Sequence, residues 1–223
     1  MDIKTNLAYI QENIRKACEK TNRDLSEITI IGVTKYVTIE RTIEAMEAGV
    51  HHFGENRAEG LLEKYNHIDQ PAKWHFIGTL QTRKVKDIID KVEAIHSLDR
   101  ESLAKQINNR ANRVIDCFVQ VNVSEEESKH GLAVADVIPF VELLAAYENI
   151  RVVGLMTMAP HVSDEEVLRK TFKDLAQLRD VIMTKNYAHA PCKYLSMGMS
   201  NDYEIAVEEG ATHIRIGSKL VGS

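Results

Sequence analysis

The stretch Ile28-Thr29-Ile30-Ile31-Gly32-Val33-Thr34-Lys35 is a β-branched apolar run that ends on a lysine. Such a run, bounded by polar residues, is typical of a strand buried on both faces. A lysine is costly to bury, so Lys35 is either a solvated residue that ends the strand or the amine of a pocket. In a pocket its ammonium would be partly desolvated and its pKa would fall, which would make a neutral amine available as a nucleophile or Schiff-base donor.

The composition is that of a globular chain. The 223 residues are 44% hydrophobic and 27% charged, which is enough for one sizeable core, so we expect residues 1–223 to form a single domain. The net charge of -5 and the lack of a basic run with interleaved aromatic residues argue against nucleic-acid binding.

The cysteine pattern and the N-terminus indicate the compartment. Cys18, Cys117 and Cys192 are odd in number and far apart, without a Cys-x-x-Cys pair, so we expect free thiols and no metal site. The N-terminus lacks the apolar stretch of a signal peptide, and no apolar run approaches the ~20 residues of a membrane span. We therefore expect a soluble, cytoplasmic protein that does not bind membranes.

Seven further segments of strand length follow the first, and helical patterns separate them. Apolar residues at helical spacing between Ile3 and Cys18 also predict a helix before the first strand. Strand-helix alternation implies parallel strands, and eight units predict a closed (β/α)8 TIM-type barrel with an extra N-terminal helix. A doubly wound open sheet is the alternative, but no Gly-x-Gly-x-x-Gly follows the first strand. The seven predicted strands are 50–53, 74–77, 94–97, 114–123, 151–156, 194–196 and 213–216.

Two helix starts carry recognisable capping signals. Thr38 is a predicted N-cap of a helix that runs to Gly49, where a glycine suits the residue after the last turn. Ser163 and Glu166 have the spacing of a capping box and predict the start of a long helix.

Polar residues follow several predicted strands. Lys35 comes after the first strand, Asn56 after the second and Arg215 in the eighth, while His75 belongs to the third. The carboxyl ends of barrel strands converge on one face, where active sites are built. A lysine and an arginine in one mouth therefore predict a ligand site.

The loops after the seventh and eighth strands have the composition of a phosphate site. They read Ser196-Met197-Gly198-Met199-Ser200-Asn201 and Gly217-Ser218. Glycines let the backbone approach an anion, and a helix predicted to begin at Ser200-Asn201 would add free N–H groups. Barrels often bind phosphate with these two loops, although helix capping alone could explain the serine.

An amine at the first strand and a phosphate site at the last two define a ligand with a carbonyl at one end and a phosphate at the other. Pyridoxal 5′-phosphate (PLP) fits, and so does a sugar phosphate held as a Schiff base. Arg215 favours PLP, because a guanidinium facing the pyridine nitrogen donates a hydrogen bond and keeps that nitrogen unprotonated.

Eight short segments, in order from near residue 30 to the end, form a specific set. Together they resemble the pyridoxal phosphate homeostasis protein family, single-domain relatives of the alanine racemase barrel. One departure is the absence of the proline that commonly follows the lysine in that family, since Tyr36-Val37-Thr38-Ile39 stands there. The segments are 33–35, 53–57, 74–78, 120–122, 127–131, 154–156, 195–202 and 215–218.

The resemblance implies a role for each candidate residue. It implies that Lys35 is the Schiff-base lysine and that Arg215 faces the pyridine nitrogen. The family is known for binding PLP and for roles in vitamin B6 balance, without an established reaction. By the same resemblance Ser200, Gly217 and Ser218 take the phosphate, and Asn56, His75 and Met199 line the pocket.

Three functions compete. The first is a non-catalytic protein of intracellular PLP homeostasis, a monomer that stores, delivers or buffers PLP and has PLP-dependent apo-enzymes as partners. The second is an amino-acid racemase, but only five residues follow Ser218, so we expect neither the second β-rich domain nor its tyrosine base. An arginine at the pyridine nitrogen also weakens PLP as an electron sink. The third is a sugar-phosphate lyase, for which Glu55 is the nearest candidate acid-base carboxylate to Lys35.

Overall fold

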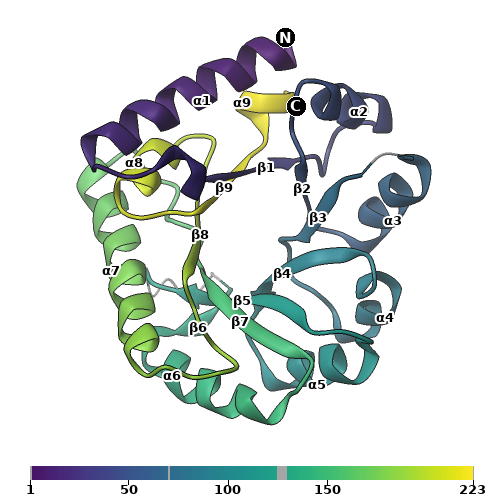
Figure 1. Cartoon of the computed structure of the whole chain (residues 1–223), viewed down its shortest axis with the longest axis vertical. Coiled ribbons are helices and arrows are strands. Elements are labelled where there is room, and N and C mark those ends of the chain that lie inside the picture. Colours follow the sequence, from purple (N-terminus) through teal and green to yellow (C-terminus); the bar gives the residue numbers. More distant parts are fainter. Residues whose placement is uncertain (1, 70, 125–129, 223) are drawn as a thin grey trace.

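The computed structural model describes residues 2–69, 71–124 and 130–222, and its strands form the predicted closed parallel barrel (Figure 1). The first strand pairs with the second and the last, and β4 pairs with β5, so the ring is complete. A short additional strand, β6 (Leu132–Ala133), pairs with the end of β5. The barrel strands are β1 (Thr29–Val33), β2 (His52–Glu55), β3 (Lys73–Phe76), β4 (Val92–Leu98), β5 (Ile115–Asn122), β7 (Ile150–Met156), β8 (Tyr194–Met199) and β9 (His213–Ile216).

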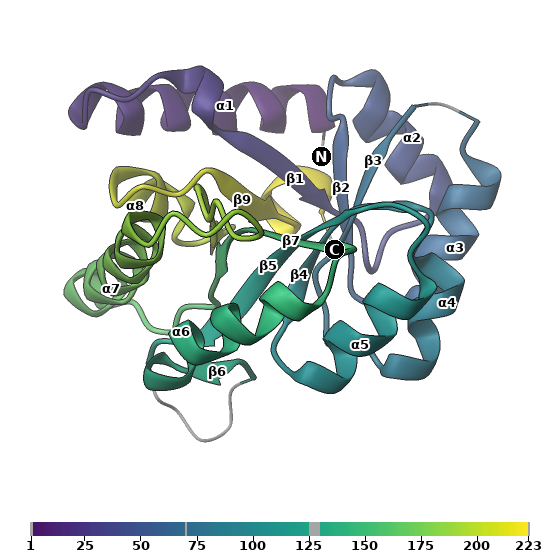
Figure 2. The ribbon, with the colours of Figure 1, turned by 60° about the horizontal axis from the view of Figure 1, so that its bottom comes forward.

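Helices surround the barrel and connect its parallel strands (Figure 2). Most buried apolar side chains form one cluster that combines strand residues with residues of the surrounding helices. The α-helices are α1 (Ile3–Lys20), α2 (Ile39–Glu47), α3 (Ala58–His67), α4 (Val85–Ile88), α5 (Glu101–Arg110), α6 (Val134–Leu143), α7 (Glu165–Thr184), α8 (Tyr203–Glu208) and α9 (Ser218–Val221). The 3-10 helices are η1 (Leu25–Glu27), η2 (Thr82–Lys84) and η3 (Leu144–Ala146).

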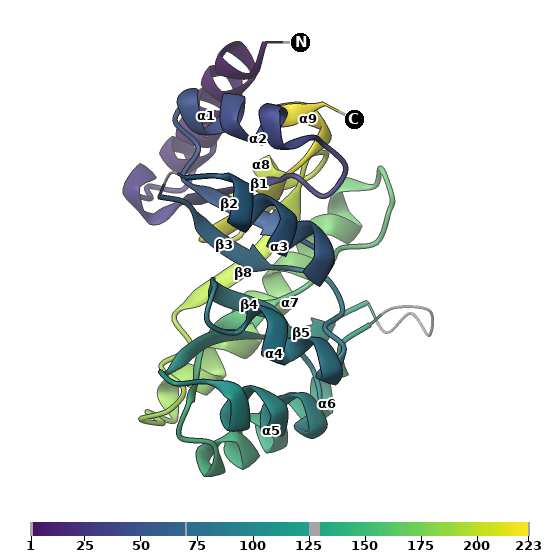
Figure 3. The same ribbon diagram turned by 90° about the vertical axis from the view of Figure 1, so that its right-hand side faces the viewer.

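The predicted N-terminal helix is present as α1. Its apolar positions between Ile3 and Cys18 are buried, and Asp2 caps it by accepting a hydrogen bond from the Thr5 backbone N–H at 2.9 Å. The helix packs on α8 and α9, so the first and last helices lie together (Figure 3). Both chain ends are therefore on the same side of the barrel.

The helix ends agree with the sequence in one case and differ in two. Thr38 caps α2 as predicted, since its hydroxyl accepts from the Arg41 N–H at 3.2 Å. The capping box at Ser163 is wrong, because Asp164 is the N-cap of α7 and accepts from the backbone N–H of Glu166 at 2.9 Å. The helix predicted to begin at 200–201 begins at Tyr203. A carboxylate next to the first turn is a stronger acceptor than a hydroxyl one residue earlier.

The interior of the barrel is partly polar. Ala94, Phe118, Val153 and Met156 form a small apolar cluster of their own. Buried histidines share the interior with this cluster, because the His96 ring stacks on that of Phe118 with centroids 4.2 Å apart. Branched apolar side chains usually fill such a barrel, so these histidines require an explanation.

Two expectations from composition can be compared with the structure. Cys18, Cys117 and Cys192 are all free, as expected, and the structure buries all three. Within the described ranges, no helix is both long enough and apolar enough to cross a membrane.

Candidate cofactor site

A cavity of about 940 Å³ opens at the carboxyl ends of the strands, and we call it the upper cavity. It is lined from β1, β2, β8 and β9 by seven of the eight predicted site residues. The structure therefore brings these residues together, while their role as cofactor ligands stays a prediction. They are Lys35, Asn56, Met199, Ser200, Arg215, Gly217 and Ser218.

Lys35 lies on the turn directly after β1, at the mouth of the upper cavity. The residue is exposed, and its ammonium stands 4.8 Å from the centroid of the Tyr36 ring. The partial desolvation predicted from the sequence is therefore not found. The position still gives a ligand in the cavity direct access to the amine.

A buried ion pair fixes the turn that carries Lys35. Lys64 of α3 donates to Glu55 Oε1 and to the carbonyl of Thr34, in both cases at 2.7 Å. The Thr34 hydroxyl donates to the same Glu55 oxygen at 2.6 Å. Glu55 is therefore engaged in holding residue 34 in place, which speaks against its use as the acid-base carboxylate of a lyase.

Arg215 is a buried cation on the wall of the upper cavity, only 4% exposed. Its guanidinium donates to Ser196 Oγ at 2.5 Å and to the Thr157 carbonyl at 2.9 Å. Burial lowers its pKa to about 10, against the opposing effect of Asp202, so the group is charged at neutral pH. A guanidinium has five N–H groups, so donors remain for a ligand in the cavity.

The loops after β8 and β9 meet on the wall of the upper cavity. The backbone N–H of Gly217 donates to Ser200 Oγ at 3.3 Å, which joins the two loops. Gly198 has φ +93, and a Cβ there would lie 2.6 Å from the Cβ of Ala206, so only glycine fits this bend. The two loops are thus brought close enough to contact one ligand group.

Asp202 places a buried carboxylate beside the loop after β8, where an anion is expected to bind. Its carboxylate accepts from the Met199 N–H at 2.5 Å, and burial raises its pKa above the usual value. The Met199 amide of this loop is therefore already engaged and adds no free donor for an anion. The hydroxyls of Ser200 and Ser218 and the nearby backbone amides remain as donors.

Asn56 is held beside the cavity by a close approach of two loops. It is half-buried directly after β2 and lines the cavity together with Gly78. A Cβ at Gly78 would lie 2.4 Å from the Asn56 carbonyl oxygen, so the approach depends on a glycine at this position.

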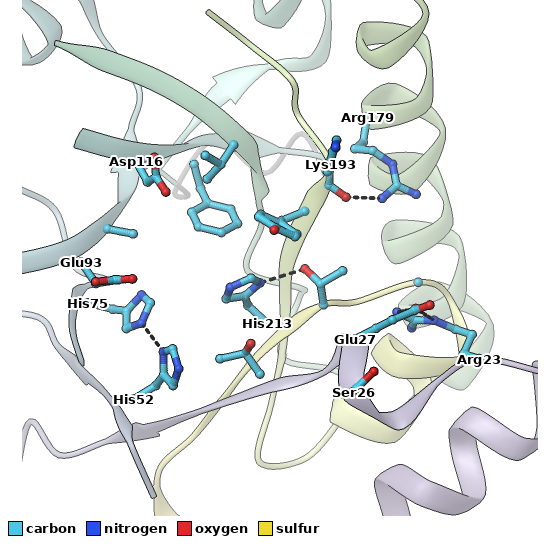
Figure 4. A pocket seen from close by; sticks show the side chains of 17 residues that line it. Arg23, Ser26, Glu27, His52, His75, Glu93, Asp116, Arg179, Lys193 and His213 are labelled. Atoms are coloured by element: carbon cyan, nitrogen blue, oxygen red, sulfur yellow. Dashed lines mark hydrogen bonds and ion pairs between the residues drawn. The ribbon is translucent and has the colours of Figure 1, made fainter. Parts of the chain in front are cut away.

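The assignment of His75 to this pocket is wrong. Its ring points into the barrel, with 2.9 Å hydrogen bonds to His52 and His96, and lines a second cavity at the amino ends of the strands (Figure 4). Ile77, two residues further on, lines the upper cavity instead. Alternation along a strand predicts which residues face the interior but not how deep each lies.

Several cavity residues were missed from the sequence. Gln120 of β5, His130, Asp202 and the segment 158–163 after β7 all line the upper cavity. The position of Gln120 on a core strand was a usable signal, since a polar side chain in such a strand is unusual. His130 belongs to the segment 127–131 of the family resemblance, of which residues 127–129 lie outside the described part of the chain.

The comparisons with known proteins agree with this geometry. A model of the alanine racemase N-terminal domain family matches residues 5–223. The pyridoxal phosphate homeostasis protein of Aquifex aeolicus is 41% identical over 220 residues, covering 97% of this chain and 96% of the relative. The protein of the same name from Pseudomonas aeruginosa is 33% identical over 225 residues, covering 99% of this chain and 95% of the relative.

Solved structures with the same fold include a relative that binds PLP and an alanine racemase. PipY of Synechococcus elongatus, in a structure with PLP bound, has a TM-score of 0.86 at 27% identity, covering 99% of this chain and 100% of that one. The alanine racemase of Clostridium difficile has a TM-score of 0.74 at 16% identity and shares the fold over 56% of its own chain. The chain belongs to the pyridoxal phosphate homeostasis proteins, within the alanine racemase N-terminal domain family.

Proposed function

We propose that this chain binds PLP in the upper cavity and serves the intracellular homeostasis of that cofactor. The observation that carries the proposal is the convergence of Lys35, Arg215 and the loop residue Ser200 on one cavity of about 940 Å³. The relatives named for PLP homeostasis and the PLP-bound PipY structure support it.

The residues present fit the chemistry of PLP. PLP supplies an aldehyde that bonds to amines and an electron-withdrawing ring. Lys35 offers an accessible amine for a covalent carbon–nitrogen bond to the aldehyde. Arg215 offers a fixed donor to the ring nitrogen, and the hydroxyls of Ser200 and Ser218 offer donors to the phosphate. Gly217 lines the same end of the cavity, where its N–H donates to Ser200 Oγ and so holds the two loops beside the phosphate. Asn56 and Met199 line the space between these groups.

We propose a carrier rather than an enzyme. Racemisation needs a proton acceptor on one face of the substrate carbon and a proton donor on the other. Tyr36, the tyrosine next to Lys35, is 75% exposed and lies under the lysine ammonium, which does not place it on the opposite face from Lys35. The cation of Arg215 disfavours a protonated ring, which is the better electron sink. An open mouth suits transfer of PLP to apo-enzymes. A cytoplasmic location, a monomeric state and a single domain over 1–223 are parts of this proposal.

Borohydride reduction tests the binding site. With PLP present, reduction should fix the cofactor on Lys35 and abolish release by dialysis, and peptide mapping should find the label there. Lys35→Ala should remove the adduct and the visible absorbance. Lys219→Ala, a change of an exposed lysine next to Ser218, is the matched control and should keep both. Full labelling of another lysine in the unmodified protein would refute the assignment.

Turnover separates the carrier from the racemase. The PLP-loaded protein is incubated with a panel of L- and D-amino acids, and chirality and keto-acid release are followed. We expect no turnover near the ~10 s⁻¹ typical of enzymes, and sustained turnover at that rate would refute the carrier.

A further inference from the structure

A continuous chain of hydrogen bonds crosses the barrel from Arg215 through Ser196, His96 and His75 to His52, and we call it the file. Arg215 donates to Ser196 Oγ, and Ser196 Oγ lies 2.8 Å from His96 Nδ1. His96 Nε2 lies 2.9 Å from His75 Nδ1, and His75 Nε2 lies 2.9 Å from His52 Nδ1. Ser196, His96 and His75 are each at most 2% exposed, so no solvent interrupts the file between its two ends.

The chemistry at one end fixes the direction of every bond in the file. A guanidinium can only donate, so Ser196 Oγ accepts from Arg215. Among the described residues, Ser196 Oγ has His96 Nδ1 as its other partner, so its hydrogen goes there. A neutral imidazole that accepts at one nitrogen donates from the other. His96 therefore donates from Nε2 to His75, and His75 donates from Nε2 to His52.

The file ends at His52 in a cavity of about 630 Å³ at the amino ends of the strands, which we call the lower cavity (Figure 4). His52 is half-buried there, and the charged and titratable groups that act on it are His51, Lys73, Glu93, His75 and His213. The remaining charged groups of the cavity wall are Arg23, Glu27, Asp116, Arg179 and Lys193.

We infer that Ser196, His96, His75 and His52 are positioning residues for Arg215, and that a proton taken up by His52 from the lower cavity weakens cofactor binding in the upper one. The inference rests on the proposed function for the identity of the ligand. The inference explains why histidines are buried in the barrel. The donor-acceptor direction of each hydrogen bond in the file fixes that of the next, starting at Arg215.

The coupling follows from the bond directions. Nδ1 of His52 accepts from His75, so a second proton on His52 places two donors face to face. Reversing the file relieves that conflict, but then His96 donates to Ser196 and the serine hydrogen loses its acceptor. The anchor of Arg215 is disturbed in consequence. Burial lowers the pKa of His52 and holds those of His75 and His96 well below the usual value, which agrees with a neutral file near pH 7.

Nitrogen NMR tests the file without any cofactor. In uniformly labelled protein at pH 7.5, His52, His75 and His96 should all carry their proton on Nε2. Ser196→Ala should remove this preference at His96, and Ser196→Thr, which keeps the hydroxyl, should restore it. A proton on Nδ1 of any of the three rings in the unmodified protein would overturn the inference.

The pH dependence of PLP binding tests the coupling. His52→Asn keeps an acceptor oxygen near the place of Nδ1 but cannot take up a proton. The ratio of the Kd of the parent protein to that of His52→Asn cancels the titration of PLP and Lys35, which both proteins share. We expect this ratio to be constant above pH 7 and to rise at least about fivefold by pH 5, the lower end of typical site-to-site coupling.

The experiment has a matched control, and two different outcomes would refute the coupling and the proposed function separately. His67→Asn, a change of an exposed histidine on α3, should leave the parent profile unchanged. A ratio that stays flat to pH 5 would overturn the coupling. Absence of PLP binding to the parent protein would instead refute the proposed function, and the tautomers of the file would then still decide whether Arg215 directs it.

Discussion

Lys64→Met should be among the most destabilising single substitutions in this chain. The Lys64 and Glu55 side chains are 7% and 1% exposed, so solvent screens their ion pair very little. Among the described residues, the Thr34 hydroxyl is then the remaining side-chain partner of the buried Glu55 carboxylate. The Thr34 carbonyl keeps its bond from the Val37 N–H at 3.2 Å, so the cost falls mainly on the carboxylate.

Removing one partner of a buried pair typically costs about 3–5 kcal/mol, because an uncompensated charge remains inside the protein. In urea, with a slope of about 1–3 kcal/mol/M, this lowers the unfolding midpoint by at least about 1 M. The turn that carries Lys35 loses its anchor at the same time. PLP binding should therefore weaken even at urea concentrations where the protein is fully folded.

Equilibrium urea unfolding, followed by circular dichroism, measures the effect. Lys64→Met combined with Glu55→Gln should recover most of the loss, because glutamine keeps an acceptor for Thr34 without a charge. Lys170→Met, in an exposed ion pair with Asp174 whose side chains are 77% and 39% exposed, should not shift the midpoint measurably. If Lys64→Met behaves like Lys170→Met, the pair does not fix the turn.

The remaining predictions concern pH and the cofactor. Burial lowers the pKa of His213 to about 3 and holds those of His75 and His96 well below the usual value, so the unfolded chain binds more protons in acid. The free energy of unfolding should therefore fall below pH ~6.5, by up to about 1.4 kcal/mol per pH unit for each ring. Urea unfolding midpoints between pH 5 and 8 measure this fall, and a midpoint that stays constant would contradict the prediction. Ser200→Ala should weaken PLP binding by one to two decades in Kd, about 1.5–3 kcal/mol, and should weaken the binding of pyridoxal, which has no phosphate, by less. Equal losses of affinity for the two ligands would place the phosphate elsewhere. Arg215→Glu should raise the pH at which the PLP ring nitrogen titrates, as read by nitrogen NMR of labelled PLP, and an already protonated ring in the parent protein would show that Arg215 does not face it.

The sequence was most informative about the barrel. Alternating apolar strands and helical patterns predicted eight parallel strands and the helix α1, and all are present. Strand ends could be predicted well enough to place Lys35, Ser200 and Arg215 at one face, because the carboxyl ends of parallel strands must converge. These features depend on local periodicity and on chain direction, both of which a sequence contains.

The sequence was less informative where two groups compete for one role. Asp164 rather than Ser163 caps α7, and α8 begins at Tyr203 because Asp202 bonds back to Met199. Each choice depends on which acceptor reaches a free N–H in the folded chain. Composition and spacing alone do not decide between neighbouring acceptors.

The sequence by itself determined the fold class, the apolar stripe of α1 and the residues that end the strands, because these follow from periods of 2 and 3.6 residues. Only the tertiary structure decided the depth of His75, the pairing of Glu55 with Lys64 and the file from Arg215 to His52. A strand's period tells which side chains enter the barrel. Their height in it, and therefore their partners, depend on the register between strands that are distant in the sequence.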